Sequence, residues 1–451
     1  MSGPKTPPRA LNVPSGRLSR LVRLGAMTTG VAGNMAISGF RDVARGNRPD
    51  MRDLFLTPTN IRRVTDDLAR MRGAAMKIGQ LLSMDTGDIL PPELSQIMAR
   101  LRAQADFMPP KQLKTVLNKA WGEGWLSRFE RFDVRPVAAA SIGQVHRAKT
   151  RDGRDMAIKV QYPGVARSID SDVANVAGLI KVSGLIPKGF DLKPYLEEAR
   201  RQLHEEADYN REGQSLRTFN QLLRAEDVFV LPEFYSDFTT PHVLAMSFVA
   251  SAPIEDAVDL PQDRRNQLTQ NLVTLVLREL FEFGVMQTDP NFANYRFEPD
   301  TDRLVLLDFG ATRAISPKVA EQYRRLFQVG LAGDTADLLA VLQDIGFIDP
   351  DTETRHQRAI LDLVEIACAA FRGRYEFDFG DTSFVQEMNK AGAALAADGF
   401  VPPQVPMDAL YIQRKLGGTF LLASRLKAKL PIQDMVSRFV EPPTKAPAIQ
   451  P

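Results

Sequence analysis

The stretch that decides the fold is MQTDPNFANY at residues 286–295, followed by RLVLLDFGATR at residues 303–313. It contains Asp289, then Asn294 five residues later, then Asp308 fourteen residues after that, directly before a Phe-Gly pair. Carboxylate and amide oxygens bind Mg²⁺ together with phosphate groups, and a further carboxylate can orient or deprotonate an attacking hydroxyl. The stretch therefore predicts a site for phosphoryl-transfer chemistry.

The order and spacing of these three residues match the catalytic Asp, the metal-binding Asn and the Asp-Phe-Gly motif of a protein kinase. Conventional kinases place a His-Arg pair before the catalytic Asp, whereas this chain has Gln287-Thr288. We predict that Asp289 is the catalytic carboxylate and that Asn294 and Asp308 hold Mg²⁺. The altered pair indicates that the catalytic loop is supported differently.

Composition places the chain among ordinary globular proteins with sizeable cores. Of its 451 residues, 44% are apolar and 25% are charged, enough for two or three domains. A net charge of +2 gives no reason to expect a nucleic-acid partner. The single cysteine, Cys368, excludes an internal disulfide and fits a reducing compartment, where we expect it to be a packed core thiol.

The first 50 residues differ from this average, with eight basic and two acidic side chains. Residues 24–40 carry no charge, but they are too few and too rich in Gly, Thr and Ser for a transmembrane helix, which needs about 20 mostly apolar residues. We favour a basic segment that contacts an anionic membrane surface. A flexible tail leading into a packing helix and a mitochondrial transit peptide remain as alternatives.

Periodicity divides the chain into a helical front, a strand-rich part and a helical remainder. Strands are expected in three pieces over 129–163, with RDGR (151–154) as a tight turn, and again at 228–235 and 242–249. Helical spacing predicts helices at 59–82, 93–104, 168–184, 193–224, 262–283, 317–331, 335–342, 355–371 and 409–429. The expected fold class is α+β, a kinase-like fold with a small strand-rich N-lobe and a helical C-lobe.

The third expected strand, DMAIKVQYP, places Lys159 after alternating apolar residues, like the Val-Ala-Ile-Lys strand of kinases. A lysine there can reach the α- and β-phosphates of ATP. Its usual partner is a glutamate on a following helix, and we predict Glu206 within QLHEEADYNREGQ. No separate chemistry is expected in the helical part after Pro317.

Two features separate the chain from conventional protein kinases. The loop expected to cover the phosphates is rich in alanine instead of glycine, and its methyl groups restrict a close backbone approach. Nothing after Arg313 resembles an activation segment, so a peptide platform is not expected and a protein substrate is disfavoured. Nucleotide binding is assigned to Lys159 together with Ala138, Ala139, Ala140, Ser141, Met246 and Val249.

With these departures, the chain resembles the UbiB family of atypical kinase-like proteins, which is linked to coenzyme Q (ubiquinone) biosynthesis. The resemblance covers roughly residues 60–320. It rests on MKIGQLLS with its Lys-x-Gly-Gln motif, the Ala-rich loop, Lys159, a Glu-x-Asp motif at Glu206 and Asp208, QTDPNFAN and LLDFGATR. The form TDPNFAN resembles the subgroup closest to the eukaryotic mitochondrial members.

The resemblance implies that a helical N-terminal extension folds over the cleft and occupies the place of a peptide substrate. By that likeness Lys77, Gly79 and Gln80 would lie at the cleft. Their acidic counterparts would be Glu206, Asp208 and Glu212. A lysine in this place favours hydrolysis, autophosphorylation or nucleotide gating over transfer to an open substrate.

Three functions follow as hypotheses. The first is an atypical kinase-like ATPase that binds Mg²⁺ and ATP and supports ubiquinone biosynthesis at the membrane by handling lipid precursors. The second is a true kinase of a small molecule or lipid. The third is a nucleotide-gated lipid-binding scaffold without useful catalysis.

The expected organisation has five segments: a basic N-terminal segment (1–58), the helical extension (59–126), the N-lobe with a helical insertion (127–250), the helical C-lobe (251–440) and a tail (441–451). The expected partners are membrane lipids, namely quinone precursors, and other ubiquinone-biosynthesis proteins; a homo-oligomer is compatible with the sequence. The expected location is the cytoplasmic face of the inner membrane of a bacterium, with mitochondria as the alternative.

Overall fold

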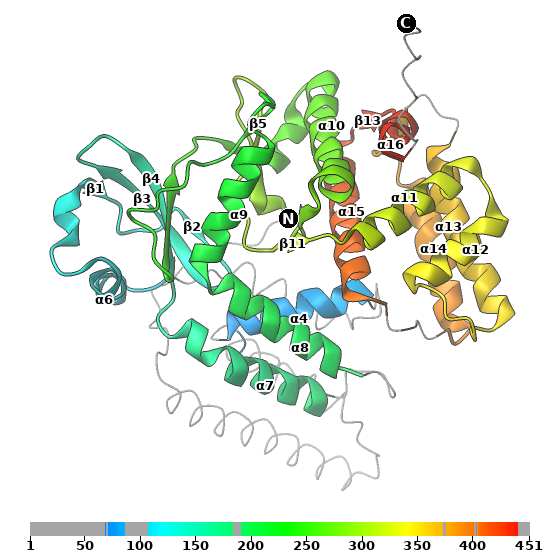
Figure 1. The fold of residues 1–451 in the computed structure, drawn as a ribbon, viewed down its shortest axis with the longest axis horizontal. Helices are drawn as coiled ribbons and strands as arrows, with labels where there is room; N and C mark the ends of the chain where they lie inside the picture. Colours follow the sequence, from blue (N-terminus) through cyan, green and yellow to red (C-terminus); the bar gives the residue numbers. More distant parts are fainter. Residues whose placement is uncertain are drawn as a thin grey trace, which may run out of the picture. The chain divides into compact units, whose positions relative to one another are not determined.

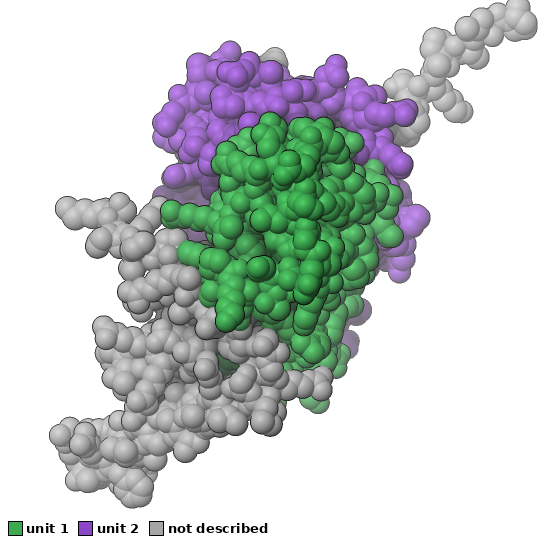
Figure 2. Space-filling view, turned by 90° about the vertical axis from the view of Figure 1, so that its left-hand side faces the viewer, with its two compact units in different colours: residues 1–217, 232–248 green, residues 218–231, 249–451 purple. Residues whose placement is uncertain are grey.

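A computed structural model describes Leu68, Pro403 and residues 71–85, 107–183, 191–372, 376–400 and 405–440 (Figure 1). The chain divides into two compact units (Figure 2). Unit 1 comprises residues 1–217 and 232–248, and unit 2 comprises residues 218–231 and 249–451. The predictions for residues 1–58, 93–104 and 441–451 lie outside the described residues.

Unit 1 contains an antiparallel sheet in the order β1-β3-β4-β6, with β2 paired to β3. The strands are β1 (Phe129–Phe132), β2 (Ala138–Ala139), β3 (Gly143–Thr150), β4 (Asp155–Gln161) and β6 (Val243–Ser247). Helix α6 (Pro110–Trp121), which the sequence analysis missed, packs Leu113 and Leu117 into the same core as Met156 and Ile158. The predicted strands and the turn at 151–154 are confirmed.

Among the described residues, unit 1 also contains α4 (Arg72–Asp85), α7 (Val165–Ser183), α8 (Lys193–Glu206) and α9 (Tyr209–Leu222), whose last residues belong to unit 2. Helix α4 packs on α8 and α7, which lie side by side (Figure 1). The helical structure predicted over 193–224 is confirmed, but it is divided between two helices, α8 and α9. Asp208 begins a second helix because its Oδ1 accepts the backbone N–H of Asn210 at 3.0 Å, as an N-cap does.

Unit 2 has a small four-stranded sheet in the order β5-β10-β9-β7. Its strands are β5 (Phe229–Val230), β7 (Ala252–Pro253), β9 (Tyr295–Phe297) and β10 (Leu304–Leu306). Strand β5 is far shorter than the strand predicted at 228–235, and Pro232, which cannot donate a backbone hydrogen bond, follows it closely. Two further strand pairs are β8 (Val285–Gln287) with β11 (Thr312–Ala314), and β12 (Phe377–Asp378) with β13 (Lys429–Leu430).

Helices form the rest of unit 2: α10 (Gln262–Arg278), α11 (Pro317–Ala332), α12 (Thr335–Ile345), α13 (Thr354–Phe371), α14 (Ser383–Ala397), α15 (Met407–Leu426) and α16 (Ile432–Val440). The predicted helices are present, and α14 and α16 are additional. Their limits follow local chemistry: Ser316 caps α11 through the N–H of Val319, and Gly333, with a φ of 75°, ends it. Among the described helices, none is long and apolar enough to cross a membrane.

Candidate functional site

Unit 1 holds a buried ion pair between Lys159 of β4 and Glu212 of α9. The Lys159 Nζ lies 2.8 and 2.9 Å from the two carboxylate oxygens of Glu212. The side chains are 10% and 3% exposed, and the Tyr209 ring lies 5.3 Å from Nζ. A lysine oriented by a glutamate on a helix is the arrangement that kinases use to position ATP phosphates.

The prediction that Glu206 pairs with Lys159 is wrong. Glu206 is the last residue of α8, whereas Glu212 lies inside α9, which begins anew after the Asp208 cap. The carboxylate of Glu206 forms an ion pair with Lys77 of α4 instead, and its Oε2 accepts the hydroxyl of Ser141 at 3.0 Å. The break between the two helices therefore separates two lysine–glutamate pairs.

The pair of Lys77 and Glu206 holds α4 against the Ala-rich loop. Lys77 is 4% exposed, and a side chain on Gly73 would meet the Ile142 Cγ2 at 2.9 Å, so α4 and the loop are in close contact. Gly79 is buried on the same helix, while the side chain of Gln80 lies outside the described residues. Of the three acids predicted to face Lys77, Glu206 forms an ion pair with it.

The Ala-rich loop is a tight turn between two paired strands. Ala138 and Ala139 form β2 and pair with β3, and the N–H of Ala140 donates to the carbonyl of Gly143 at 2.8 Å. Gly143 is needed for packing, because a Cβ there would lie 2.4 Å from the carbonyl oxygen of Val160 in the neighbouring strand. The close approach of the two strands is enough to explain why residue 143 is a glycine, without any contact to phosphate.

Gly143→Ala is expected to destabilise unit 1 by about 1–3 kcal/mol, the usual range for overpacking. The reason is the collision of the new methyl group with the backbone of β4. Thermal unfolding measures the change, and Gly178→Ala is the control because a Cβ at Gly178 of α7 meets nothing within 4 Å. An unchanged midpoint for Gly143→Ala would show that the strand spacing adjusts.

That Met246 and Val249 contact the nucleotide stays a prediction. Met246 is buried in β6, opposite Ala157 of β4, and Val249 is half-buried just past the end of that strand.

Unit 2 brings the predicted catalytic and metal residues onto adjoining turns. The Nδ2 of Asn294 donates to the backbone carbonyl of Asp289 at 3.2 Å and lies 3.4 Å from its Oδ2. The N–H of Leu307 donates to the carbonyl of Asn294 at 3.2 Å, which places the following residue, Asp308, beside the same turn. Asp308 Oδ1 accepts the N–H of Gly310 at 3.0 Å.

The residues present fit a metal bound jointly by protein and phosphate. No group of three or more His, Cys, Asp or Glu side chains among the described residues could hold a metal alone. Mg²⁺ in phosphoryl-transfer sites takes one or two protein oxygens and completes its shell with phosphates and water. Asn294 and Asp308 meet this requirement.

Helix α15 supplies two cations to the Asp289 loop that the sequence analysis missed. The Arg414 Nη2 lies 2.6 Å from Asp289 Oδ1, and the two side chains are 12% and 19% exposed. An arginine paired with a carboxylate fixes the position of that carboxylate through a charge-assisted hydrogen bond. Arg414 therefore occupies one of the two carboxylate oxygens of Asp289.

The second cation, Lys415, is buried beneath the loop. Its Nζ donates to the carbonyl of Gln287 at 2.8 Å and to the hydroxyl of Tyr295 at 2.9 Å, and lies 3.1 Å from Glu279 Oε2. Glu279 Oε1 accepts the N–H of Gln287 at 3.1 Å. Burial lowers the pKa of Lys415, but Glu279 and Tyr295 more than offset this and raise it, so the amine stays charged.

The contacts of Lys415 and Glu279 explain how the Asp289 loop is held without the His-Arg pair of conventional kinases. Gln287 is held through its backbone by Lys415 and Glu279, and the Thr288 hydroxyl donates to the carbonyl of Ala311 at 2.8 Å. The prediction that the region after Pro317 adds no chemistry is wrong. No local pattern could have found Arg414 and Lys415, which lie at least 120 residues from their partners.

Comparison with known proteins agrees with this geometry. Residues 100–342 match the model of the ABC1 atypical kinase-like domain. The chain belongs to this family. The chain is 36% identical over 94% of its length, and 68% of the relative's, to a protein of Danio rerio named atypical kinase COQ8B, mitochondrial. It is 35% identical to atypical kinase COQ8, mitochondrial, of Saccharomyces cerevisiae, covering 94% of this chain and 84% of the relative.

A solved structure shares the fold of this ABC1 family member. Rv3197 of Mycobacterium tuberculosis, solved as a complex with erythromycin, aligns with a TM-score of 0.60 and 23% identity. The alignment covers 84% of this chain and 96% of that one. This match confirms the α+β kinase-like fold. The family model and the COQ8 relatives confirm the resemblance to the UbiB group.

Proposed function

We propose that this chain binds Mg²⁺ and ATP, hydrolyses ATP slowly, and supports coenzyme Q biosynthesis at a membrane surface. The observation that carries the nucleotide part is the buried pair of Lys159 and Glu212, together with the turn that joins Asp289, Asn294 and Asp308. The family membership and the names of the COQ8 relatives support the coenzyme Q part.

Each of the main residues has a distinct task in this proposal. Lys159, oriented by Glu212, would contact the α- and β-phosphates, while Asn294 and Asp308 would hold the metal ion. When bound, the metal ion offsets the negative charge that develops on the phosphates. Asp289, whose Oδ1 is held by Arg414, would position the attacking water.

Two contacts favour hydrolysis over transfer to a protein substrate. The ion pair between Lys77 and Glu206 fastens α4 to α8, and Arg414 occupies one oxygen of Asp289. The second contact also supports another candidate, a nucleotide-gated lipid-binding scaffold. Asp289→Asn distinguishes the two: the scaffold keeps its function in cells with this variant, whereas the ATPase loses it.

Lys159→Met is expected to weaken ATP binding about ten- to hundred-fold, because a charge-assisted hydrogen bond contributes about 1.5–3 kcal/mol. Equilibrium binding of a fluorescent ATP analogue measures the loss. Lys149→Met is the matched control, since Lys149 lies on the neighbouring strand β3 and pairs with Glu130 at the surface. Equal affinity for all three proteins would contradict the phosphate role of Lys159. Circular dichroism establishes that the Lys159→Met variant, which leaves Glu212 without this partner, is folded.

The membrane and quinone parts are tested separately. The rate of phosphate release from Mg-ATP is expected to rise when liposomes containing anionic lipid are added. An unchanged rate would contradict membrane coupling. Deletion of the gene is expected to lower cellular coenzyme Q, and a normal level would remove that part of the proposal. We place the protein at the bacterial inner membrane or, as in the relatives named mitochondrial, in mitochondria, with lipid precursors and quinone-pathway proteins as partners.

A further inference from the structure

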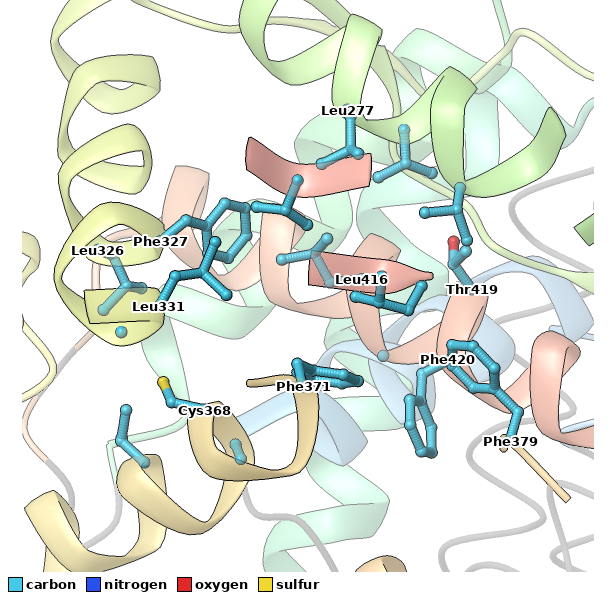
Figure 3. A pocket seen from close by; sticks show the side chains of 18 of the residues that line it. Leu277, Leu326, Phe327, Leu331, Cys368, Phe371, Phe379, Leu416, Thr419 and Phe420 are labelled. Carbon is cyan, nitrogen blue, oxygen red and sulfur yellow. The ribbon is translucent and has the colours of Figure 1, made fainter. Parts of the chain in front are cut away.

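An apolar cavity lies within unit 2 and is lined by residues of α10, α11, α13, α14, α15 and α16 (Figure 3). Its volume is about 380 Å³, within the range of about 300–1,000 Å³ found for small-molecule pockets. The wall includes the exposed Gly417 and the half-buried Leu416 and Cys368, so the cavity is open to solvent and a ligand can enter it.

The lining is almost free of polar groups. Aromatic rings form much of it, namely Phe327, Phe371, Phe379, Phe384 and Phe420. Among the described lining residues, only Cys368 and Thr419 contribute a side-chain heteroatom, and the Thr419 hydroxyl already donates to the carbonyl of Lys415 at 2.8 Å. Figure 3 shows the Cys368 sulfur on the same side as Leu331 and Phe327.

We propose that this cavity binds one uncharged hydrocarbon chain, such as the isoprenoid or acyl tail of a lipid. A charged or strongly polar ligand would lose its hydration and find no partner here. Water would likewise find too few hydrogen bonds to occupy the cavity well. An apolar chain gains about 25 cal/mol for each Å² of apolar surface that leaves water.

The cavity is separate from the proposed nucleotide site, because none of its lining residues belongs to that site. Helix α15 nevertheless contributes to the cavity and also contacts the Asp289 loop. Leu416 and Gly417 line the cavity, and they directly follow Arg414 and Lys415, which contact the Asp289 loop. A bound chain would therefore pack on the helix that holds this loop.

The test uses diphenylhexatriene, an uncharged hydrocarbon that fluoresces only in apolar surroundings. The full-length protein is expected to bind it saturably at one site per chain. Gly417→Leu should reduce this affinity at least tenfold, because Gly417 lines the cavity and a Cβ there meets nothing within 4 Å. Gly178→Leu is the matched control, a helical glycine of α7 with equally open space, and should bind like wild type.

A second readout comes from Cys368, the only cysteine of the chain. Burial raises the pKa of its thiol, so alkylation by N-ethylmaleimide is followed at alkaline pH. Micromolar farnesol or dodecanol should slow this reaction several-fold and displace diphenylhexatriene. Preference for farnesol assigns an isoprenoid tail, and preference for dodecanol assigns an acyl tail.

Three results would overturn the proposal. They are the absence of saturable binding, equal binding by wild type and Gly417→Leu, and a Cys368 alkylation rate that neither ligand changes. None of these measurements needs nucleotide, so a failure here is distinct from a failure of the proposed ATPase.

Discussion

Asp308→Asn is expected to reduce ATP hydrolysis at least about 100-fold, because it removes the anionic oxygen proposed to hold the metal, and metal-ion stabilisation of a transition state is worth several kcal/mol. The fold should survive. Asparagine has the shape of aspartate and keeps a side-chain oxygen for the N–H of Gly310, which Asp308 Oδ1 accepts at 3.0 Å. The loss should therefore be one of catalysis and not of stability.

The measurement is phosphate release from Mg-ATP by purified protein, together with thermal unfolding of each variant. Asp300→Asn is the control, because it makes the same chemical change at an exposed residue of unit 2. If Asp308→Asn hydrolyses ATP like wild type, the assignment of the metal site is wrong. If wild type itself binds ATP without hydrolysing it, the scaffold becomes the better proposal.

The parts of the site that the sequence predicts well are those set by short-range spacing. Asp289 and Asn294 are five residues apart, and a single turn brings them together. Lys159 follows from the alternation of a strand, and the structure places it on β4 between β3 and β6. Local geometry alone decides these features.

The parts that the sequence analysis missed depend on where a helix stops or on contacts between distant segments. Choosing Glu212 over Glu206 as the partner of Lys159 requires knowing that Asp208 starts a new helix, which propensity does not reveal in an acidic, polar stretch. Arg414 lies 125 residues beyond Asp289. Arginine and lysine on a helix are usually solvent-exposed, so nothing in the local pattern of α15 marks two of them as partners of a buried loop.

Lys415→Met is expected to destabilise the protein by about 3–5 kcal/mol, since removal of one partner leaves the other buried charge uncompensated. Both Lys415 and Glu279 are 0% exposed, so water cannot replace the lost contact. The carbonyl of Gln287 and the hydroxyl of Tyr295 would also lose a donor at the base of the Asp289 loop. We expect a lower unfolding midpoint and slower ATP hydrolysis together.

A double-mutant cycle separates the lost ion pair from lost packing. Combining Lys415→Met with Glu279→Leu replaces both charges by apolar groups of similar size, and this change is often neutral or stabilising for a buried pair. The double variant should therefore recover much of the stability that Lys415→Met loses. Lys429→Met, which breaks an exposed ion pair with Asp378, should unfold like wild type. If Lys415→Met also unfolds like wild type, the cluster does not hold the loop, and the replacement of the kinase His-Arg pair must rest on other contacts, such as that between Thr288 and Ala311.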